Sequence, residues 1–124
     1  VRSRTARRVR LTAEPFCPDL PIRVRTVHRV PIVRGTHHTP QAERVAGPPV
    51  DLPDPLFPDN ELELQANRTD CFWLDVEVPP TTKPGKYQTR IEVSSDGSAV
   101  ELRLVLNVHQ ATVPHQGKLL LNPG

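Results

Sequence analysis

The fold is decided by residues 71–109, which read CFWLDVEVPPTTKPGKYQTRIEVSSDGSAVELRLVLNVH. Side chains on a β-strand point alternately to the two faces of a sheet, and this stretch alternates between apolar and polar residues over three segments. One apolar and one polar face are typical of an antiparallel sheet with a single buried side. The residues predicted to point inward are Phe72, Leu74, Val76, Val78, Tyr87, Ile91, Val93, Val100, Leu102, Leu104, Leu106 and Val108.

Two turns are expected to join these three strands into a meander. Asp96-Gly97 is a dipeptide typical of a tight two-residue hairpin, because both central residues of that turn need positive φ. Lys83-Pro84-Gly85-Lys86 has proline at the second position and glycine at the third, which predicts a type II turn. The segment therefore predicts three neighbouring antiparallel strands.

The rest of the chain predicts further short strands at residues 7–13, 22–33, 61–66 and 118–122. Val9 and Leu11 are expected to point inward, and Pro31 is expected to lie at a sheet edge or a bulge because proline cannot donate to a central ladder. The 15 prolines of this 124-residue chain also disfavour long helices. We predict a single all-β domain, an antiparallel Ig-like β-sandwich of about seven strands.

Residues 34–60 contain many prolines and no sustained period, which predicts one long loop. Loops of this length inside a compact domain are usually functional or disordered. Its apolar side chains argue against disorder and need a surface to pack on. We therefore predict that a docking surface against a neighbouring domain is formed by Leu52, Pro53, Asp54, Pro55, Leu56 and Phe57.

The first 34 residues carry nine arginines against two acids, Glu14 and Asp19. Such a segment can indicate binding to nucleic acid or to an acidic surface. Five of these arginines alternate with apolar residues, which favours the polar side of two strands instead, and no aromatic residues interleave them as stacking platforms. These five are Arg8, Arg10, Arg23, Arg25 and Arg29. We expect neither a nucleic-acid partner nor a membrane partner.

The chain contains no recognisable catalytic constellation, and we predict no catalytic residue, no metal site and no cofactor. His37-His38 is an adjacent pair without a third ligand at a known spacing, which makes a poor chelate. Acids on the polar strand faces are expected to pair with Arg90 and Arg103 across the sheet. These acids are Asp75, Glu77, Glu92 and Glu101.

Three other side chains leave alternatives open. Trp73 lies on the polar face of its strand, where its ring either stacks on a sugar or is covered by the long loop or a neighbouring domain. Cys17 and Cys71 either form a disulfide or remain two small buried residues. Nothing in the sequence fixes the distance between them.

A family resemblance rests on the segment DVEVPPTTKPGKYQTRIEVSSDG, which resembles bacterial Ig-like accessory domains. Two more motifs narrow the resemblance, LPDPLFP at 52–58 upstream of the Trp-Leu-Asp-Val strand and NVHQATVP at 107–114 downstream. In this order, residues 20–114 are similar to the N-terminal β-sandwich domain of glycoside hydrolase family 123. Residues 1–19 contribute nothing to the resemblance.

The resemblance implies a sandwich that precedes a catalytic (β/α)8 barrel and an enzyme that removes terminal β-linked N-acetylgalactosamine. The family mechanism is assisted by the 2-acetamido group of the substrate and uses an adjacent Asp-Glu pair. This chain has no Asp-Glu pair, so no catalytic residue can be assigned to it.

We therefore expect a non-catalytic accessory domain of a secreted bacterial glycoside hydrolase, extracellular or periplasmic by resemblance. Residues 1–114 would form the sandwich, and residues 115–124 a linker or the start of the following catalytic domain, its partner. The alternative is a carbohydrate-binding module that contacts glycan through Trp73. The chain alone is not expected to be an enzyme, and it is expected to be a piece of a longer polypeptide.

Overall fold

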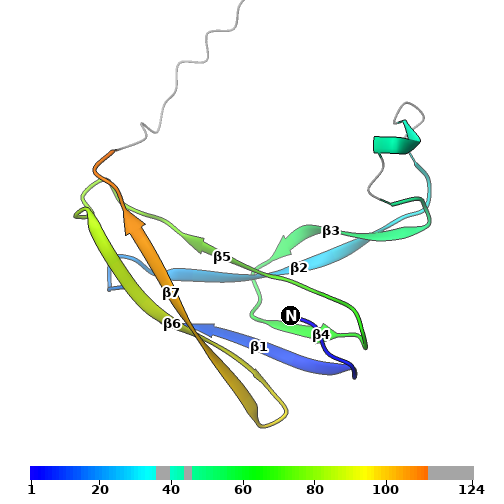
Figure 1. Ribbon diagram of the computed structural model, residues 1–124, viewed down its shortest axis with the longest axis horizontal. Helices are drawn as coiled ribbons and strands as arrows, with labels where there is room; N and C mark the ends of the chain where they lie inside the picture. The colour runs from blue at the N-terminus through cyan, green and yellow to red at the C-terminus, as the bar shows by residue number, and fades with distance from the viewer. Residues whose placement is uncertain (36–39, 44–45, 112–124) are drawn as a thin grey trace, which may run out of the picture.

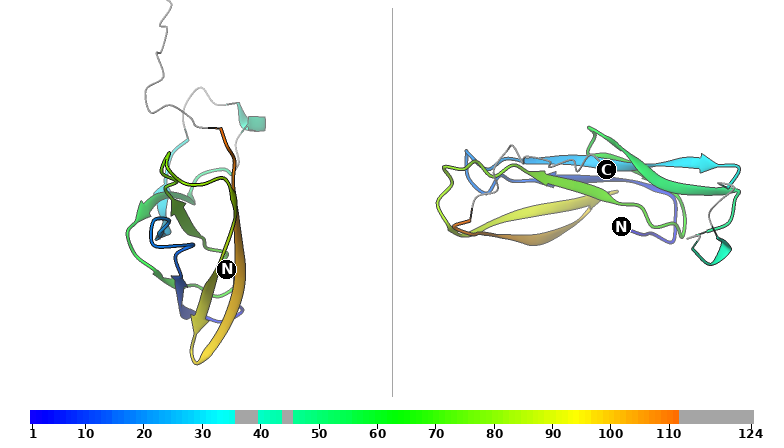
Figure 2. Two further views of the ribbon diagram at one scale, coloured as in Figure 1. Left: turned by 90° about the vertical axis from the view of Figure 1, so that its left-hand side faces the viewer. Right: turned by 90° about the horizontal axis from the view of Figure 1, so that it is seen from above.

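The computed structural model describes residues 1–35, 40–43 and 46–111, and these ranges form two layers of antiparallel β-strands (Figures 1 and 2). One sheet has four strands in the order β4-β1-β6-β7, and the other has three in the order β3-β2-β5. The predicted all-β sandwich of about seven strands is confirmed over the described ranges. The strand expected at 118–122 lies outside the described residues, and β3 is a strand that was not expected. The elements are β1 (Arg7–Ala13), β2 (Ile22–Ile32), the short 3₁₀ helix η1 (Gln41–Glu43), β3 (Val50–Phe57), β4 (Glu61–Leu64), β5 (Phe72–Val76), β6 (Gly85–Ser95) and β7 (Ser98–Val108).

The predicted three-strand meander is wrong in its first strand. β6 and β7 form a hairpin, but β5 pairs with β2 in the opposite sheet, where Leu74 lies opposite Val24. The connection between β5 and β6 therefore crosses from one layer to the other (Figure 1). An alternating strand has the same pattern in either layer, so the pattern predicts the inward face without predicting the neighbouring strand.

The two predicted turns have different outcomes. Asp96 and Gly97 have φ values of 48° and 79°, as the tight hairpin requires. Gly85 has a φ of 154° and already belongs to β6, whereas a type II turn needs about +80° there. A hydrogen-bonded turn lies further upstream, where the Thr82 N–H donates to the Pro79 carbonyl at 2.9 Å.

The predicted long loop at residues 34–60 is also wrong in part, because residues 50–57 form strand β3. β3 pairs with β2 in register from Val50 opposite Ile32 to Phe57 opposite Thr26, with an irregularity near Arg29. β3 is an edge strand, so its prolines can turn their nitrogen away from the ladder. Pro31 lies where β2 has β3 on one side only, as predicted.

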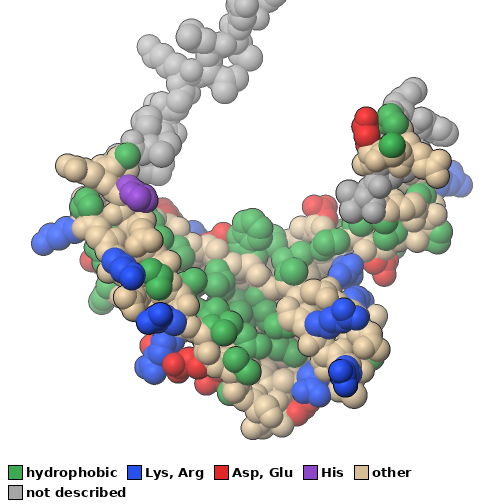
Figure 3. Space-filling view, in the orientation of Figure 1, with side chains coloured by type: hydrophobic (Ala, Val, Ile, Leu, Met, Phe, Trp, Pro, Cys, Tyr) green, Lys and Arg blue, Asp and Glu red, His purple; other side chains and the backbone are tan. Residues whose placement is uncertain are grey.

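The core is concentrated under β1 and β4. Among the described residues, its buried apolar side chains are Val9, Leu11, Leu20, Leu62 and Leu64. Val9 and Leu11 point inward as predicted, and the two sheets contact each other chiefly through β1 and β2. Val100 and Leu102 on β7 were expected to be buried but are exposed, because the smaller sheet does not cover them. Hydrophobic side chains are visible in the open middle of the molecule (Figure 3).

Candidate functional site

A buried ionic cluster lies just before the start of β5, beside the three-stranded sheet. The Asp70 carboxylate is 5% exposed and accepts hydrogen bonds from the Nε groups of Arg29 and Arg68, each at 2.9 Å. Arg29 also donates to the carbonyl oxygens of Asp51 and Thr69, at 3.0 and 2.7 Å. One guanidinium thus ties β2 to the beginning of β3 and to the segment before β5.

The pKa of the Asp70 carboxyl lies below its ordinary value. Burial by itself raises this pKa, but the hydrogen bonds and positive charges of Arg29 and Arg68 together outweigh burial. The ionised form is therefore the form that the fold stabilises. Sequence reasoning missed this cluster, although the short spacing between Arg68 and Asp70 was a signal for a local ion pair.

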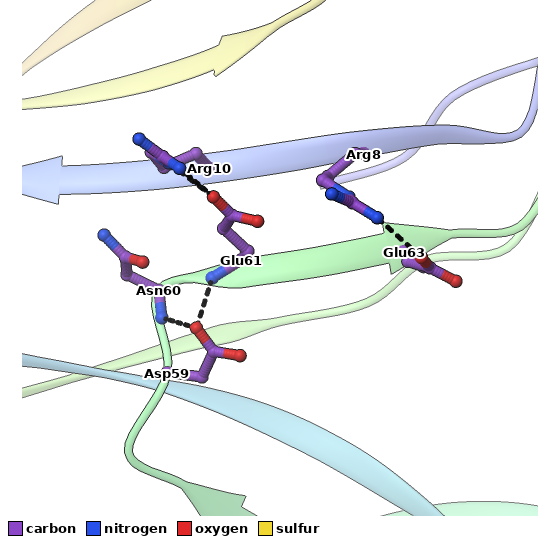
Figure 4. A network of polar contacts seen from close by, with 6 residues as sticks. All are labelled: Arg8, Arg10, Asp59, Asn60, Glu61 and Glu63. Atoms are coloured by element: carbon purple, nitrogen blue, oxygen red, sulfur yellow. Dashed lines mark hydrogen bonds and ion pairs between the residues drawn. The ribbon is translucent and has the colours of Figure 1, made fainter.

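A cleft of about 510 Å³ opens beside this cluster, between β2 and β4. Most of its charged lining groups have ionic partners: Arg8 Nη2 lies 3.1 Å from Glu63 of the lining, and Glu61 contacts Arg10 Nε, outside the lining, at 2.7 Å (Figure 4). The Asp59 carboxylate accepts the backbone N–H groups of the next two residues and so fixes the start of β4. In these contacts the acids of the cleft stabilise the fold. The lining residues are Arg8, Val27, His28, Arg29, Asp59, Glu61, Leu62, Glu63, Arg68 and Asp70.

All five alternating arginines of the first 34 residues have acidic partners. Besides the pairs of Arg8, Arg10 and Arg29, Arg23 contacts Glu77 at 3.3 Å, and Arg25 contacts Asp75 at 2.7 Å. Cross-strand pairing therefore uses the positive charge that could otherwise have attracted phosphate groups. The predicted pairing of Glu101 with Arg90 is confirmed at 3.4 Å, whereas Asp75 and Glu77 pair with arginines of β2 instead.

Trp73 lies on the outer face of the smaller sheet and is 52% exposed. Its indole N–H donates to Asp75 Oδ1 at 2.7 Å, while Arg25 Nε donates to Asp75 Oδ2 at 2.7 Å. The hydrogen bond from Trp73 is the largest influence on the pKa of Asp75 and, with Arg25, lowers it. The ring is thus held in one orientation on the surface of β5.

The predicted docking residues lie on β3, where they no longer form a loop. Leu52 and Pro55 are half-buried, and the other four are exposed. Phe57 is 47% exposed, and its ring lies 4.3 Å from the ring of His28 at an angle of 51°. Leu56 is 38% exposed. Consecutive residues point to opposite faces of a strand, so Leu56 and Phe57 present apolar surface on both sides of this edge.

The cysteines and the possible metal ligands are the last candidates from the sequence. Cys17 and Cys71 are unbonded, so the disulfide alternative is wrong; the alternative of two buried residues is wrong as well, because Cys17 is half-buried and Cys71 is exposed. Across the described ranges, no three histidine, cysteine or carboxylate side chains converge on one point. His37 and His38 lie outside the described residues.

The described part of the chain contains no helix long and apolar enough to cross a membrane. Its strands form a two-sheet β-domain in which ion pairs cover the polar faces and two edges expose apolar side chains. These features define the class of a β-sandwich module.

The chain belongs to the glycoside hydrolase 123 N-terminal domain family, whose model matches residues 25–95. This match begins within β2 and ends with β6, so the resemblance inferred from the sequence is confirmed. No curated protein matched the chain.

Proposed function

We propose that this domain is the non-catalytic N-terminal support of a secreted bacterial glycoside hydrolase and docks on a catalytic (β/α)8 domain that follows in the same polypeptide. Membership of the glycoside hydrolase 123 N-terminal domain family supports this proposal. By the same family resemblance, the parent enzyme acts on terminal β-linked N-acetylgalactosamine, outside the cell or in the periplasm. The domain itself needs no cofactor.

The observation that carries the docking proposal is the apolar end of β3. Leu56 and Phe57 expose apolar surface on the two sides of an edge strand, and the contact with His28 restrains the Phe57 ring before any partner arrives. Pro53 and Pro55 leave this edge short of N–H donors, which disfavours strand addition. Docking here would therefore use side chains, with Phe57 as the anchor.

Replacing Phe57 by Asp in the parent polypeptide should separate the unfolding of the two domains. Full burial of a phenylalanine contributes about 2 kcal/mol, and a carboxylate in an apolar contact removes that contribution and adds a desolvation cost. We expect differential scanning calorimetry to show one coupled transition for the parent and two for the Phe57→Asp variant.

The matched control is Val33→Asp, because Val33 is 77% exposed just beyond the end of β2 and outside the apolar end of β3. This control should keep the coupled transition. Circular dichroism of the isolated 124-residue chain tells whether Phe57→Asp still folds. Equal calorimetric traces for the two folded variants would remove β3 as the docking surface.

A second candidate function is glycan binding through Trp73, and its favouring observation is the exposed, oriented indole on β5. Because Trp73 is the single tryptophan of the chain, its fluorescence reports on this site alone. The docking proposal predicts an unchanged emission when the chain is titrated with N-acetylgalactosamine-containing glycans at millimolar concentration. A saturable change that Trp73→Ala abolishes in ligand binding measured by calorimetry would favour the binding module instead.

A further inference from the structure

The free edge of β7 differs from the three other sheet edges. β4 and β5 have four and five residues, and β3 contains prolines, all of which limit pairing with another chain. β7 has 11 residues without proline or lysine, and it pairs with β6 along its entire length. No backbone hydrogen bond to its other side is found in the described part of the chain. This edge is therefore an open template for strand addition.

The side chains of β7 also lack cover on both faces. Val100 and Leu102 point to the inner face and are 59% and 50% exposed, while Val105 on the outer face is 39% exposed. An unprotected strand that exposes apolar residues on each face is stabilised when a second strand lies beside it. β7 also lies beyond residues 25–95, which match the family model.

The charges of β7 are poorly matched within the hairpin. Arg103 lies directly opposite Arg90, and Glu101 lies directly opposite Glu92. Like charges directly opposite each other destabilise a sheet. Glu101 reaches Arg90 diagonally, but Arg103 has no ion-pair partner among the described residues. A strand that supplies an acid opposite Arg103 would correct this mismatch.

The hairpin determines which backbone groups of β7 are available. Ser95 and Ser98 flank the two-residue turn and form a hydrogen-bonded pair, and such pairs alternate along an antiparallel ladder. The even-numbered residues of β7 therefore direct their N–H and C=O groups to β6. The odd-numbered residues, which include Glu101 and Arg103, direct theirs to the free edge.

We propose that two copies of the chain associate through β7, antiparallel, with Leu102 opposite Leu102 of the second copy on the twofold axis. Glu101 then lies opposite Arg103 of the second copy, and the symmetric pair repeats the contact. Glu101 and Arg103 both direct their backbone N–H and C=O groups to the free edge. Each Glu101 can therefore form a hydrogen-bonded backbone pair with Arg103 of the second copy. Val100 meets Leu104 of the second copy on the inner face, which extends the apolar surface across the axis.

Alternative registers lack this agreement. Sliding the second strand by two residues, the smallest shift that keeps the inner faces of both copies on the same side, puts Glu101 opposite Glu101, or Arg103 opposite Arg103, on the axis. Larger shifts separate the two charges from each other. In the proposed antiparallel register, each Glu101 lies opposite an Arg103. Because the charges of β7 are complementary to those of a second β7, we identify a second copy of the chain as the partner of this edge.

A charge-reversal experiment on the full 124-residue chain tests the proposal by sedimentation equilibrium from micromolar to near-millimolar concentration. Glu101→Arg and Arg103→Glu each place like charges at both symmetric contacts, so each variant alone should have a dissociation constant raised about tenfold or more. An equimolar mixture of the two variants should form heterodimers, because every contact is again complementary. Glu43→Arg, an exposed position on η1 outside both sheets, is the matched control and should dimerise like the unmodified chain.

Cysteine crosslinking tests the register, in a chain whose Cys17 and Cys71 are replaced by Ser. Residues facing each other in a non-hydrogen-bonded pair have Cα atoms about 4.5 Å apart, within reach of a disulfide. Leu102→Cys should therefore form a disulfide-linked dimer on mild oxidation, whereas Val100→Cys, which faces position 104, should form little. A chain that remains monomeric at every concentration, a dimer that survives both charge reversals, or equal crosslinking at the two positions would overturn the proposal.

Discussion

Replacing Asp70 by Asn should lower the free energy of unfolding by about 3 kcal/mol, the largest effect expected from any single polar substitution in this domain. The change removes the negative charge that accepts hydrogen bonds from Arg29 and Arg68 and leaves two guanidinium groups with incomplete partners. Their side chains are only 25% and 31% exposed, so water compensates in part. Urea denaturation of the two proteins measures the difference.

The matched control is Glu63→Gln, which breaks the pair with Arg8 on the surface, where the side chains are 84% and 66% exposed. Such exposed pairs contribute at most about 1 kcal/mol. A loss at Asp70 no larger than the loss at Glu63 would contradict the structural role of the buried cluster.

The stabilising contribution of Asp70 should also depend on pH. Because the folded-state pKa of its carboxyl is lowered, the contribution is fully present above the unfolded-state pKa and is lost as the pH falls through the folded-state pKa. The stability difference between the unmodified chain and Asp70→Asn should therefore be constant near neutral pH and shrink in acid.

Leu11→Ala should destabilise the domain by about 3 kcal/mol, an effect of the same size with a different origin. Leu11 is 5% exposed on β1, the strand that lies between β4 and β6 and contacts the other sheet through β2. Truncation leaves a cavity where the two layers meet. Thermal unfolding followed by circular dichroism measures this loss.

The control for Leu11 is Val33→Ala, because Val33 is 77% exposed and makes no comparable core contact. Its effect should stay within about 0.5 kcal/mol. Similar losses at the two positions would mean that the core does not lie under β1.

The sequence allowed prediction of the strands and their inward faces better than of their partners. Val9 and Leu11 alternate with arginines and are buried as expected, and Asp96-Gly97 forms the predicted hairpin turn. The position of β5 was missed because Phe72, Leu74 and Val76 would point inward from either sheet. Which sheet contains β5 depends on its long-range pairing with β2, and the local alternation of apolar and polar residues does not predict that pairing.

The misassignment of β3 has a related cause. Pro53 and Pro55 disfavour a strand when its neighbours are unknown, but on an edge the missing N–H groups face away from the ladder. Burial was also overestimated for Val100 and Leu102, since the pattern shows which face is apolar without showing whether a second sheet reaches it. The four-stranded sheet extends beyond the three-stranded sheet only in the assembled fold, so the local sequence pattern does not reveal which residues stay uncovered.

For the candidate sites too, the sequence predicted the face on which a residue lies better than its contacts. Trp73 was expected on the polar face of its strand and lies there, but the hydrogen bond to Asp75 that orients its ring depends on the strand geometry. The Asp70 cluster was not predicted, because Arg29 is far from Asp70 in sequence and is brought beside it only by the pairing of β2 with β3 and β5.

The central claim is that β3 docks on a following catalytic domain, and hydrogen exchange tests it most directly. Amide exchange over residues 50–58 is compared between the intact parent polypeptide and the isolated 124-residue chain, with β1 as the internal reference. We expect slower exchange around Leu56 and Phe57 in the parent and unchanged exchange in β1. Equal exchange over residues 50–58 in the two proteins would mean that β3 does not dock on a following domain.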